Sequence, residues 1–292
     1  MTNAAEASPP APLDALLESS FKDIGIPPRP LILDRISREM LKEEPDYKRL
    51  TNVIGADVSL SASLIKTANS PYFGFRNRVR SINEALMMLG LDVASRAIAG
   101  IILRKVFANS PHLERFWDAS ARIARLSGWL AQYVGNNKLR ADDAYTFGLF
   151  RDCGIPVLLI RFPGYQKILT QANAEDQLSF TAVENSQLPT NHAMVGCLLA
   201  QSWWLPEETC LAIRHHHDAA IIETPAVTPP LSSRHLIAVA QLAEHLLQRH
   251  TGLSHTHEWP KLGAACLRLL NIDEDEVDGI FAESVRVIET ED

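Results

Sequence analysis

Residues 81–90, Ser-Ile-Asn-Glu-Ala-Leu-Met-Met-Leu-Gly, carry start and stop signals for an α-helix. Ser81 followed three residues later by Glu84 is a capping box, in which the serine accepts a backbone N–H and the glutamate reaches back. Gly90 is suited to end the helix, because glycine readily adopts the left-handed conformation found just after helices. The stretch therefore predicts a short helix that ends at Gly90.

The same kind of pattern extends over nearly the whole chain. Thr181 and Glu184 have the spacing of a second capping box, and Pro206 followed by two glutamates is a good first helical turn. Strand signals are nearly absent: no apolar residues alternate with period two over a sustained run, and no Asn-Gly or Asp-Gly turn occurs. The sequence predicts an all-α fold, a helical bundle with additional C-terminal helices.

Three prolines between residues 218 and 234 suggest a long connection before a helix from about Ser233 to Arg249. Residues 277–288 place apolar side chains at helical spacing, and Asp273 is a plausible N-cap, so we expect an amphipathic helix that docks on the core. We expect a loosely structured segment over residues 1–20, a domain over 21–220, and a connection with packed helices over 221–292.

The composition is that of a globular protein, with 46% apolar and 22% charged residues among 292. The net charge of −7 is concentrated in residues 271–292, which carry nine acids and one base; the other 270 residues sum to +1. A near-neutral body does not attract polyanions strongly. We therefore expect neither nucleic acid nor a membrane as a partner.

Four widely spaced cysteines with no CxxC pair predict reduced thiols rather than a disulfide framework or a thiolate zinc site. The first residues lack the basic start and apolar core of a signal peptide. No uninterrupted apolar run approaches the roughly 18 residues that span a bilayer. We expect a cytoplasmic protein.

The densest group of metal-ligand side chains is Arg-His-His-His-Asp at residues 214–218. Adjacent side chains on a helix diverge by about 100°, so at most two of these histidines can share one ion. The alternative is a helix end at which histidine suits the dipole and one ring is packed inside. Another candidate is His192, in the first turn of a helix that Thr190 could cap.

A loop between two predicted helices combines aromatic and basic residues. It could bind a nucleotide or phosphate; its candidate binding residues are Asn69, Ser70, Tyr72, Arg76, Arg78 and Arg80. The alternative, which we favour, is an ordered loop whose aromatic side chains fill the core and whose arginines are solvated.

These segments occur in an order that closely resembles the HDOD domain, which is related to the HD-type metal-dependent phosphohydrolases. The resemblance runs from about residue 20 to 220, and its most specific block is Ala-Asn-Ser-Pro-Tyr-Phe-Gly at residues 68–74. Gly-Leu-Phe-Arg-Asp-Cys-Gly at residues 148–154 and the histidine run agree with it. It implies a bacterial signalling or regulatory module with an HD-like helical bundle.

By this resemblance, the catalytic relatives place histidines and aspartates around a divalent cation, and this chain departs from them. Ala119 stands where a histidine is expected, Arg151 replaces the histidine of the His-Asp pair, and Glu244 falls at the distal aspartate. A permanent guanidinium charge opposes metal binding, and Arg151 beside Asp152 resembles a salt bridge at the old metal position. The positions of this vestigial site are Ala119, Arg151, Asp152, His192, His216, His217 and Glu244.

The leading interpretation is a non-catalytic signalling protein, without a cofactor, that binds a protein partner or a small phosphorylated ligand. The second is a residual phosphohydrolase or phosphodiesterase that holds manganese, iron or zinc through Asp152, His192, His216 and His217. The third is a nucleic-acid regulator that uses Arg76, Arg78 and Arg80.

Overall fold

The computed structural model describes residues 24–108, 113–135, 139–223, 229–253 and 256–289. Within these ranges the chain forms helices and no β-strand, which confirms the all-α prediction. The expectation of a loose segment over residues 1–20 lies outside the described residues.

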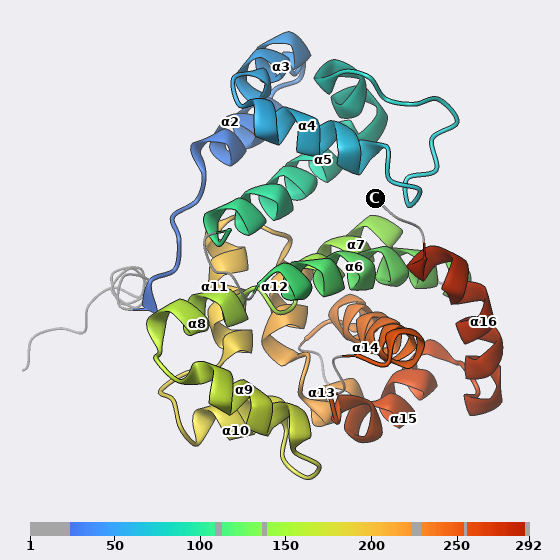
Figure 1. Ribbon diagram of the computed structural model, residues 1–292. Helices are drawn as coiled ribbons and strands as arrows, with labels where there is room; N and C mark the ends of the chain where they lie inside the picture. The colour runs from blue at the N-terminus through green and yellow to red at the C-terminus, as the bar shows by residue number, and fades with distance from the viewer. Residues whose placement is uncertain (1–23, 109–112, 136–138, 224–228, 254–255, 290–292) are drawn as a thin grey trace, which may run out of the picture.

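Four helices form a lobe at the top of Figure 1. They are α2 (Leu31–Met40), α3 (Tyr47–Gly55), α4 (Val58–Ala68) and α5 (Ile82–Val106). The aspartates just before α3 and α4 cap them, since the side chain of Asp46 accepts the Arg49 N–H and that of Asp57 accepts the Leu60 N–H. Helix α5 is the central element of this lobe and contacts the other three.

Helix α5 begins as its sequence predicts, and its first segment ends at Gly90, also as predicted. Ser81 caps it by accepting the Glu84 N–H at 3.1 Å, while the Glu84 carboxylate accepts the N–H of Arg80, one residue before the expected partner. Gly90 has a positive φ of 74° that suits glycine and lies outside the helical range, so the first helical segment ends there and a kink joins it to a second segment. Helical turns resume at Leu91 because the apolar side chains beyond the kink are buried in the core.

By length and composition, α5 is also apolar enough to cross a membrane, which the count of uninterrupted apolar runs did not indicate. Of its most apolar stretch, 56% is buried inside the protein. Its buried side chains pack against α2, α3, α4 and α7.

The body of the molecule is built around α6 (Glu114–Val134), α7 (Ala141–Phe150) and α14 (Leu231–Thr251), which pack side by side. Helix α14 is buried along most of its length; α12 (Glu207–His215) packs on it, and α11 (His192–Ser202) packs on α12. Pro206 precedes α12, as predicted.

The remaining helices cover this core (Figure 1). They are α8 (Gly154–Arg161), α9 (Tyr165–Ala174), α10 (Phe180–Asn185), α13 (Ala219–Glu223), α15 (Glu258–Leu270), the 3₁₀ turn η1 (Glu274–Glu276) and α16 (Val277–Ile288). Asp273 caps the turn that leads into α16, and the apolar face of α16 docks on α6 and α14. The prediction of a docked amphipathic helix is confirmed.

Three boundaries differ from the sequence predictions. Ser179, not Thr181, caps α10 by accepting the Ala182 N–H at 3.2 Å, because the Glu184 carboxylate points into the core instead of back to the cap. Asn191, not Thr190, caps α11. Helix α14 begins two residues earlier than expected, because proline residues fit the position just before a helix.

All four cysteines are free and buried, as the absence of paired spacing predicted.

Candidate functional site

Four side chains from three helix ends meet inside the body of the molecule. Asp152 follows α7, His192 is the first residue of α11, and His216 and His217 follow the last residue of α12. One ligand atom from each lies within 4.8 Å of the others. These four residues, called the His–Asp cluster below, are the ones that the sequence analysis named as ligands if a metal binds.

The three imidazoles turn the same ring nitrogen inward. The Nε2 atom of His192 lies 3.3 Å from that of His216 and 3.1 Å from that of His217. The Asp152 Oδ1 atom lies 3.3 Å from His216 Nε2 and 3.6 Å from His192 Nε2. The centre of the group is therefore lined by three nitrogens and one carboxylate oxygen.

Each outward-facing Nδ1 atom lies against an atom that can only accept a hydrogen bond. His192 Nδ1 is 2.8 Å from Glu184 Oε2, His216 Nδ1 is 2.7 Å from the Ile213 carbonyl, and His217 Nδ1 is 2.5 Å from Glu258 Oε2. All three Nδ1 atoms must carry their proton to make these bonds. A neutral ring then presents the lone pair of Nε2 to the centre.

Lone pairs in such close contact repel unless a cation lies among them. Burial and neighbouring His216 lower the pKa of His217 to about 3, so this ring is neutral at ordinary pH. Burial also tends to lower the pKa of His192, but Glu184 and Asp152 outweigh it and raise that pKa. The centre thus favours one positive charge, supplied either by a proton on His192 or by a bound cation.

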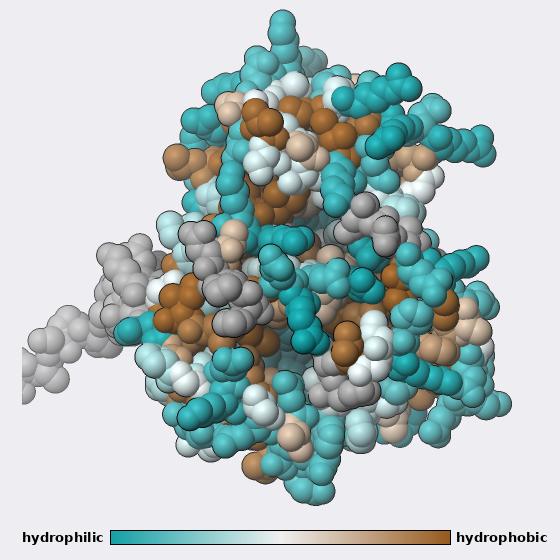
Figure 2. Space-filling model, viewed as in Figure 1, coloured by the Kyte–Doolittle hydropathy of each residue, from teal (hydrophilic) through white to brown (hydrophobic). Residues whose placement is uncertain are grey.

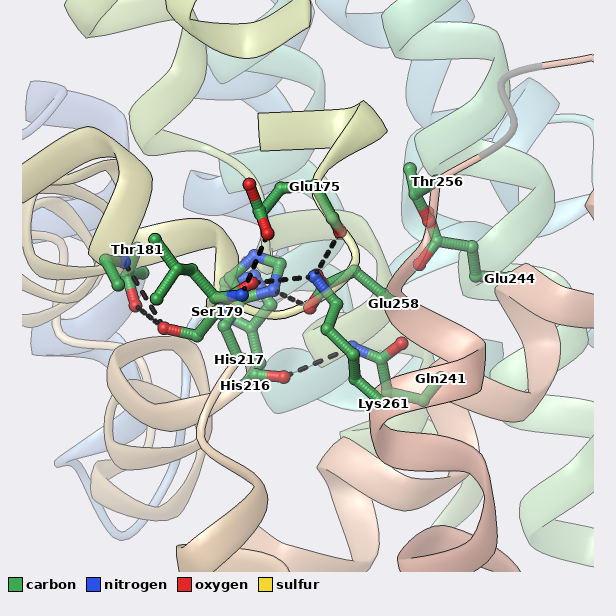
Figure 3. Close-up of polar contacts among 12 residues, drawn as sticks. Glu175, Ser179, Thr181, His216, His217, Gln241, Glu244, Thr256, Glu258 and Lys261 are labelled. Atoms are coloured by element: carbon green, nitrogen blue, oxygen red, sulfur yellow. Dashed lines mark hydrogen bonds and ion pairs between the residues drawn. The ribbon is translucent and has the colours of Figure 1, made fainter. Parts of the chain in front are cut away.

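Two buried carboxylates hold the rings in place, and the sequence did not reveal either role. Glu184 is fully buried and accepts from His192 and from the Tyr165 hydroxyl. Glu258 receives Lys261 Nζ at 2.5 Å, and Gln241 donates to the His216 carbonyl at 3.1 Å, as Figure 3 shows. The spacing of Glu184 from Thr181 resembled a cap, and nothing local to Glu258 links it to the histidine run.

The end of α12 explains how adjacent histidines can converge. His215 is the last helical residue and stays at the surface, whereas His216 and His217 lie in the turn that follows. Their ring centroids are 4.0 Å apart, and Phe180 of α10 stacks on His217 at 4.8 Å. Two histidines of the run share the site, the maximum that the sequence allowed.

Arg151 occupies the other side of Asp152. Its Nε atom lies 2.9 Å from Asp152 Oδ2 and its Nη2 atom 2.9 Å from Glu244 Oε1, with only 6% of the side chain exposed. Burial by itself raises the pKa of Asp152, but Arg151 and the two nearby histidines hold it well below its usual range. The predicted Arg151–Asp152 salt bridge is present, and Glu244 completes it from α14.

A cavity of about 710 Å³ opens onto these residues. Arg151, Asp152, His217 and Glu244 line it together with Ala119, which lies on α6. His192 and His216 are almost completely buried behind them. Of the seven vestigial-site positions, five line the cavity and the other two form its buried support.

The loop after α4 is ordered by the side chain of Asn69. Its Nδ2 atom donates to the carbonyls of Ile65, at 3.0 Å, and Val79, at 2.7 Å, and its Oδ1 atom accepts the Val79 N–H at 2.8 Å. These bonds tie the start of the loop to its end. The Asn69 amide is thus fully used within the chain.

The aromatic residues of this loop fill a junction between the lobe and the body. Tyr72 stacks on Tyr145 of α7 at 4.7 Å and contacts Phe73 edge-on. A Cβ atom on Gly128 would lie 2.2 Å from the Tyr72 ring, so only glycine lets this ring approach α6. Ser70 is buried at the end of α4, where its hydroxyl faces the Tyr72 N–H at 3.4 Å.

The loop arginines stay outside this junction. Arg76, Arg78 and Arg80 are exposed, and none of them pairs with an acidic residue in the part of the chain that the structure describes. None of the six candidate loop residues is hydrogen-bonded or ion-paired to the His–Asp cluster among the described contacts. The favoured alternative, aromatic side chains packed inward and solvated arginines, agrees with the structure.

The HDOD domain family matches residues 26–219, about two-thirds of the chain. The chain belongs to the HDOD domain family. An uncharacterized protein of Treponema pallidum is 28% identical over 227 residues, which are 77% of this chain and 43% of that protein. The HDOD chain thus spans less than half the length of this curated relative.

Solved structures of similar fold come from other bacteria. A Shewanella amazonensis protein provisionally named a phosphohydrolase has a TM-score of 0.65 at 20% identity, covering 94% of this chain and 96% of the other. A Marinobacter aquaeolei protein provisionally named a signal transduction protein has a TM-score of 0.64 at 22% identity, covering 93% and 59%. At these identities the likeness shows the HDOD fold alone.

The residues of the cluster fit one divalent cation. A tetrahedral ion that binds nitrogen at about 2.0–2.1 Å places neighbouring ligand atoms about 3.3 Å apart. The Nε2 atom of His192 lies at 3.3 and 3.1 Å from those of His216 and His217, which is close to this value. Histidine ligands typically donate their other N–H to a carboxylate or carbonyl, which all three do here. On the other side of Asp152, the permanent positive charge of Arg151 opposes the binding of a second cation.

Proposed function

We propose that the chain is a non-hydrolytic regulatory protein of the HDOD type that acts in the cytoplasm. It works by binding a signalling protein partner or a small phosphorylated ligand. The observation that carries the proposal is the position of Arg151, whose guanidinium group lies between the carboxylates of Asp152 and Glu244.

A phosphohydrolase of this type needs positive charge from metal ions to neutralise the phosphate and to activate water. Arg151 supplies a fixed cation in place of a ligand, and it cannot lose its proton to bind an ion. Ala119 offers no donor atom to the same side of the cavity. Together they leave half of the expected site without metal ligands.

The cavity suits binding instead. About 710 Å³ is within the size range of small-molecule sites, and its walls combine apolar residues with a few charged groups. Arg115 on the rim and Arg151 on the floor are cations that a phosphate or an acidic side chain could contact. The provisional signal-transduction name of the Marinobacter aquaeolei protein supports a regulatory role.

A second candidate function, a residual phosphohydrolase, is favoured by one observation. Asp152, His192, His216 and His217 keep a ligand set with all its supporting hydrogen bonds. A cation held there would polarise a phosphoryl oxygen and activate water. The prediction that the chain binds no metal stays a prediction.

Hydrolysis of bis(p-nitrophenyl) phosphate in the presence of manganese, ferrous iron or zinc separates the two functions. The test compares the wild type with a His216→Ala/His217→Ala double variant. It also includes Arg151→His, a variant in which the His-Asp pair of the catalytic relatives is restored. We expect the wild-type rate to equal that of the double variant with every metal. Metal-dependent turnover that the double variant loses would establish the hydrolase and overturn the proposal.

Metal content of the untagged protein, measured by inductively coupled plasma mass spectrometry, gives the second readout. One ion per chain that the double variant loses, without hydrolysis, would assign the cluster a structural or regulatory ion. Hydrolysis together with that ion would assign it catalysis.

A further inference from the structure

A second cleft, separate from the His–Asp cluster, lies between the upper lobe and the body. Its volume is about 400 Å³, and Figure 2 shows a recess between these two parts of the molecule. Residues from α4, α5, α6 and α7 line it. None of the residues of the His–Asp cluster is among them.

The face of α4 that lines this cleft is polar and partly open to solvent, since Ser59 and Lys66 are exposed. Helix α4 presents Ser59, Ser63 and Thr67 at intervals of four residues, with Lys66 beside them and Ser70 one turn on. Such a face is expected on the surface of a helix, but it lines the wall of a cleft. It offers the cleft four hydroxyl groups and one ammonium group.

The opposite walls add more positive charge. Arg104 and Lys105 come from the last turn of α5, and Arg125 comes from the middle of α6, where only 6% of it is exposed. Lys105 pairs with Asp57 at 2.7 Å. Lys66 and Arg104 form no ion pair with any residue that the structure describes. None of the described residues that line the cleft is acidic.

Several donors in this cleft have no acceptor. The hydroxyl groups of Ser63 and Thr67 form no hydrogen bond with the described residues, although helical serine and threonine often bond the preceding turn. The indole N–H of Trp117 also has no acceptor among them, but its nitrogen atom is itself buried and does not face the open cleft. Lys66 and Arg104 are exposed and Ser63 and Thr67 are half-buried, so these groups are open to solvent and free to contact an anionic ligand in the cleft.

The remaining wall is apolar and aromatic. Ile101, Leu149, Tyr145 and Trp117 lie along it, and Gly100 brings α5 against Leu149, where a Cβ atom would be 2.4 Å away. A cleft of about 400 Å³ is too large for a single phosphate ion and falls in the size range of small organic ligands. Aromatic and apolar side chains beside cations are the features that bind a base and its phosphate.

We propose that this inter-lobe cleft binds a nucleotide, with its phosphate on Lys66, Arg104 and the α4 hydroxyl groups and its base on the apolar wall. The inference rests on the proposed function and refines it, because it assigns the small phosphorylated ligand to this cleft rather than to the cavity lined by Arg151.

Isothermal titration calorimetry with AMP, GMP, CMP, UMP, adenosine and inorganic phosphate tests the site on the full chain. We expect at least one nucleotide to bind, with adenosine and inorganic phosphate each about tenfold weaker or more, since each lacks one half of the contacts. Arg104→Glu and Lys66→Glu should each weaken the nucleotide by about tenfold or more. Thr67→Val, which removes only a hydroxyl group, should weaken it several-fold.

Arg38→Glu is the matched control, because Arg38 is an exposed arginine on α2 of the same lobe and does not line the cleft. It should leave nucleotide binding unchanged. Binding of no nucleotide, or binding that Arg104→Glu and Arg38→Glu affect equally, would overturn the inference.

The failure of this inference and that of the proposed function are distinguishable. Lack of nucleotide binding in a protein without hydrolytic activity would remove the cleft assignment alone. Metal-dependent hydrolysis abolished by the His216→Ala/His217→Ala variant would remove the proposed function, while binding sensitive to Arg104→Glu would keep the cleft assignment.

Discussion

The Nη2 atom of Arg151 lies 2.9 Å from Glu244 Oε1, joining the end of α7 to the middle of α14 in the protein interior. The same guanidinium group holds Asp152, so one arginine neutralises two carboxylates that belong to segments about 90 residues apart in the chain. Burial tends to lower the pKa of Arg151, but the two acids outweigh it and raise that pKa. The charge at this position is therefore permanent.

Arg151→Met should lower the free energy of unfolding by about 3–5 kcal/mol, because it leaves two buried carboxylates without their cation. Glu244→Gln should lower the free energy of unfolding by less, since Asp152 still pairs with Arg151. In the Arg151→Met/Glu244→Gln double variant the two losses should not add. A double-mutant cycle measured by urea unfolding should give a coupling energy above about 1 kcal/mol. Additive losses would show that the Arg151–Glu244 pair contributes nothing.

Glu184→Ala should also destabilise the protein by about 3–5 kcal/mol, because Glu184 is a buried partner of His192 and of Tyr165. Tyr165→Phe is the matched control, as it removes one hydrogen bond to the same carboxylate and should cost about 1–2 kcal/mol. Urea unfolding of metal-free protein measures both. Equal losses would mean that the carboxylate contributes no more than the hydroxyl group.

Asn69→Ala should lower the free energy of unfolding by about 2–3 kcal/mol, since it removes three hydrogen bonds and leaves the buried Val79 backbone without partners. Asn77→Ala, at an exposed position of the same loop, should change it by less than about 0.5 kcal/mol. Chemical denaturation followed by circular dichroism gives both values. A loss at Asn69 no larger than that at Asn77 would contradict the role of this side chain.

Gly154→Ala should be strongly destabilising and should disturb the cluster, because a Cβ atom would lie 2.0 Å from the His192 carbonyl oxygen. The contact is with backbone rather than with a flexible side chain, so α11, the helix that carries His192, would have to move away from α8. We expect the free energy of unfolding to fall by more than about 2 kcal/mol.

Gly279→Ala is the matched control, since nothing lies within 4 Å of its Cβ position in α16. It should stabilise the protein by up to about 1 kcal/mol through helix propensity. The unfolding temperatures of the two variants should shift in opposite directions. A shift of the same sign and size in both would refute the close approach at Gly154.

Local sequence signals predicted the helical elements well because caps and apolar spacing act over a single turn. Ser81 and Asp273 cap where expected, and the docked face of α16 follows from its apolar spacing. The signals failed where a tertiary contact outweighed them. Glu184, for example, does not complete the predicted capping box with Thr181, because its carboxylate accepts from the buried His192 ring instead.

The candidate site divides in the same way. Resemblance to known motifs pointed to Asp152, His192, His216 and His217, and the structure brings those four together. It gave no indication of Glu258, which reaches His217 from α15, or of Lys66 and Arg104, which face one cleft from two helices. Each of these depends on how distant helices pack.

By itself, the sequence determined the all-α class and the identity of the residues that could bind metal, since helix signals and side-chain chemistry are local properties. Only the tertiary structure decided which charges neutralise one another, which donors lack acceptors and where the two clefts lie. Those properties are set by distances between segments far apart in the chain, and packing of the hydrophobic core fixes these distances.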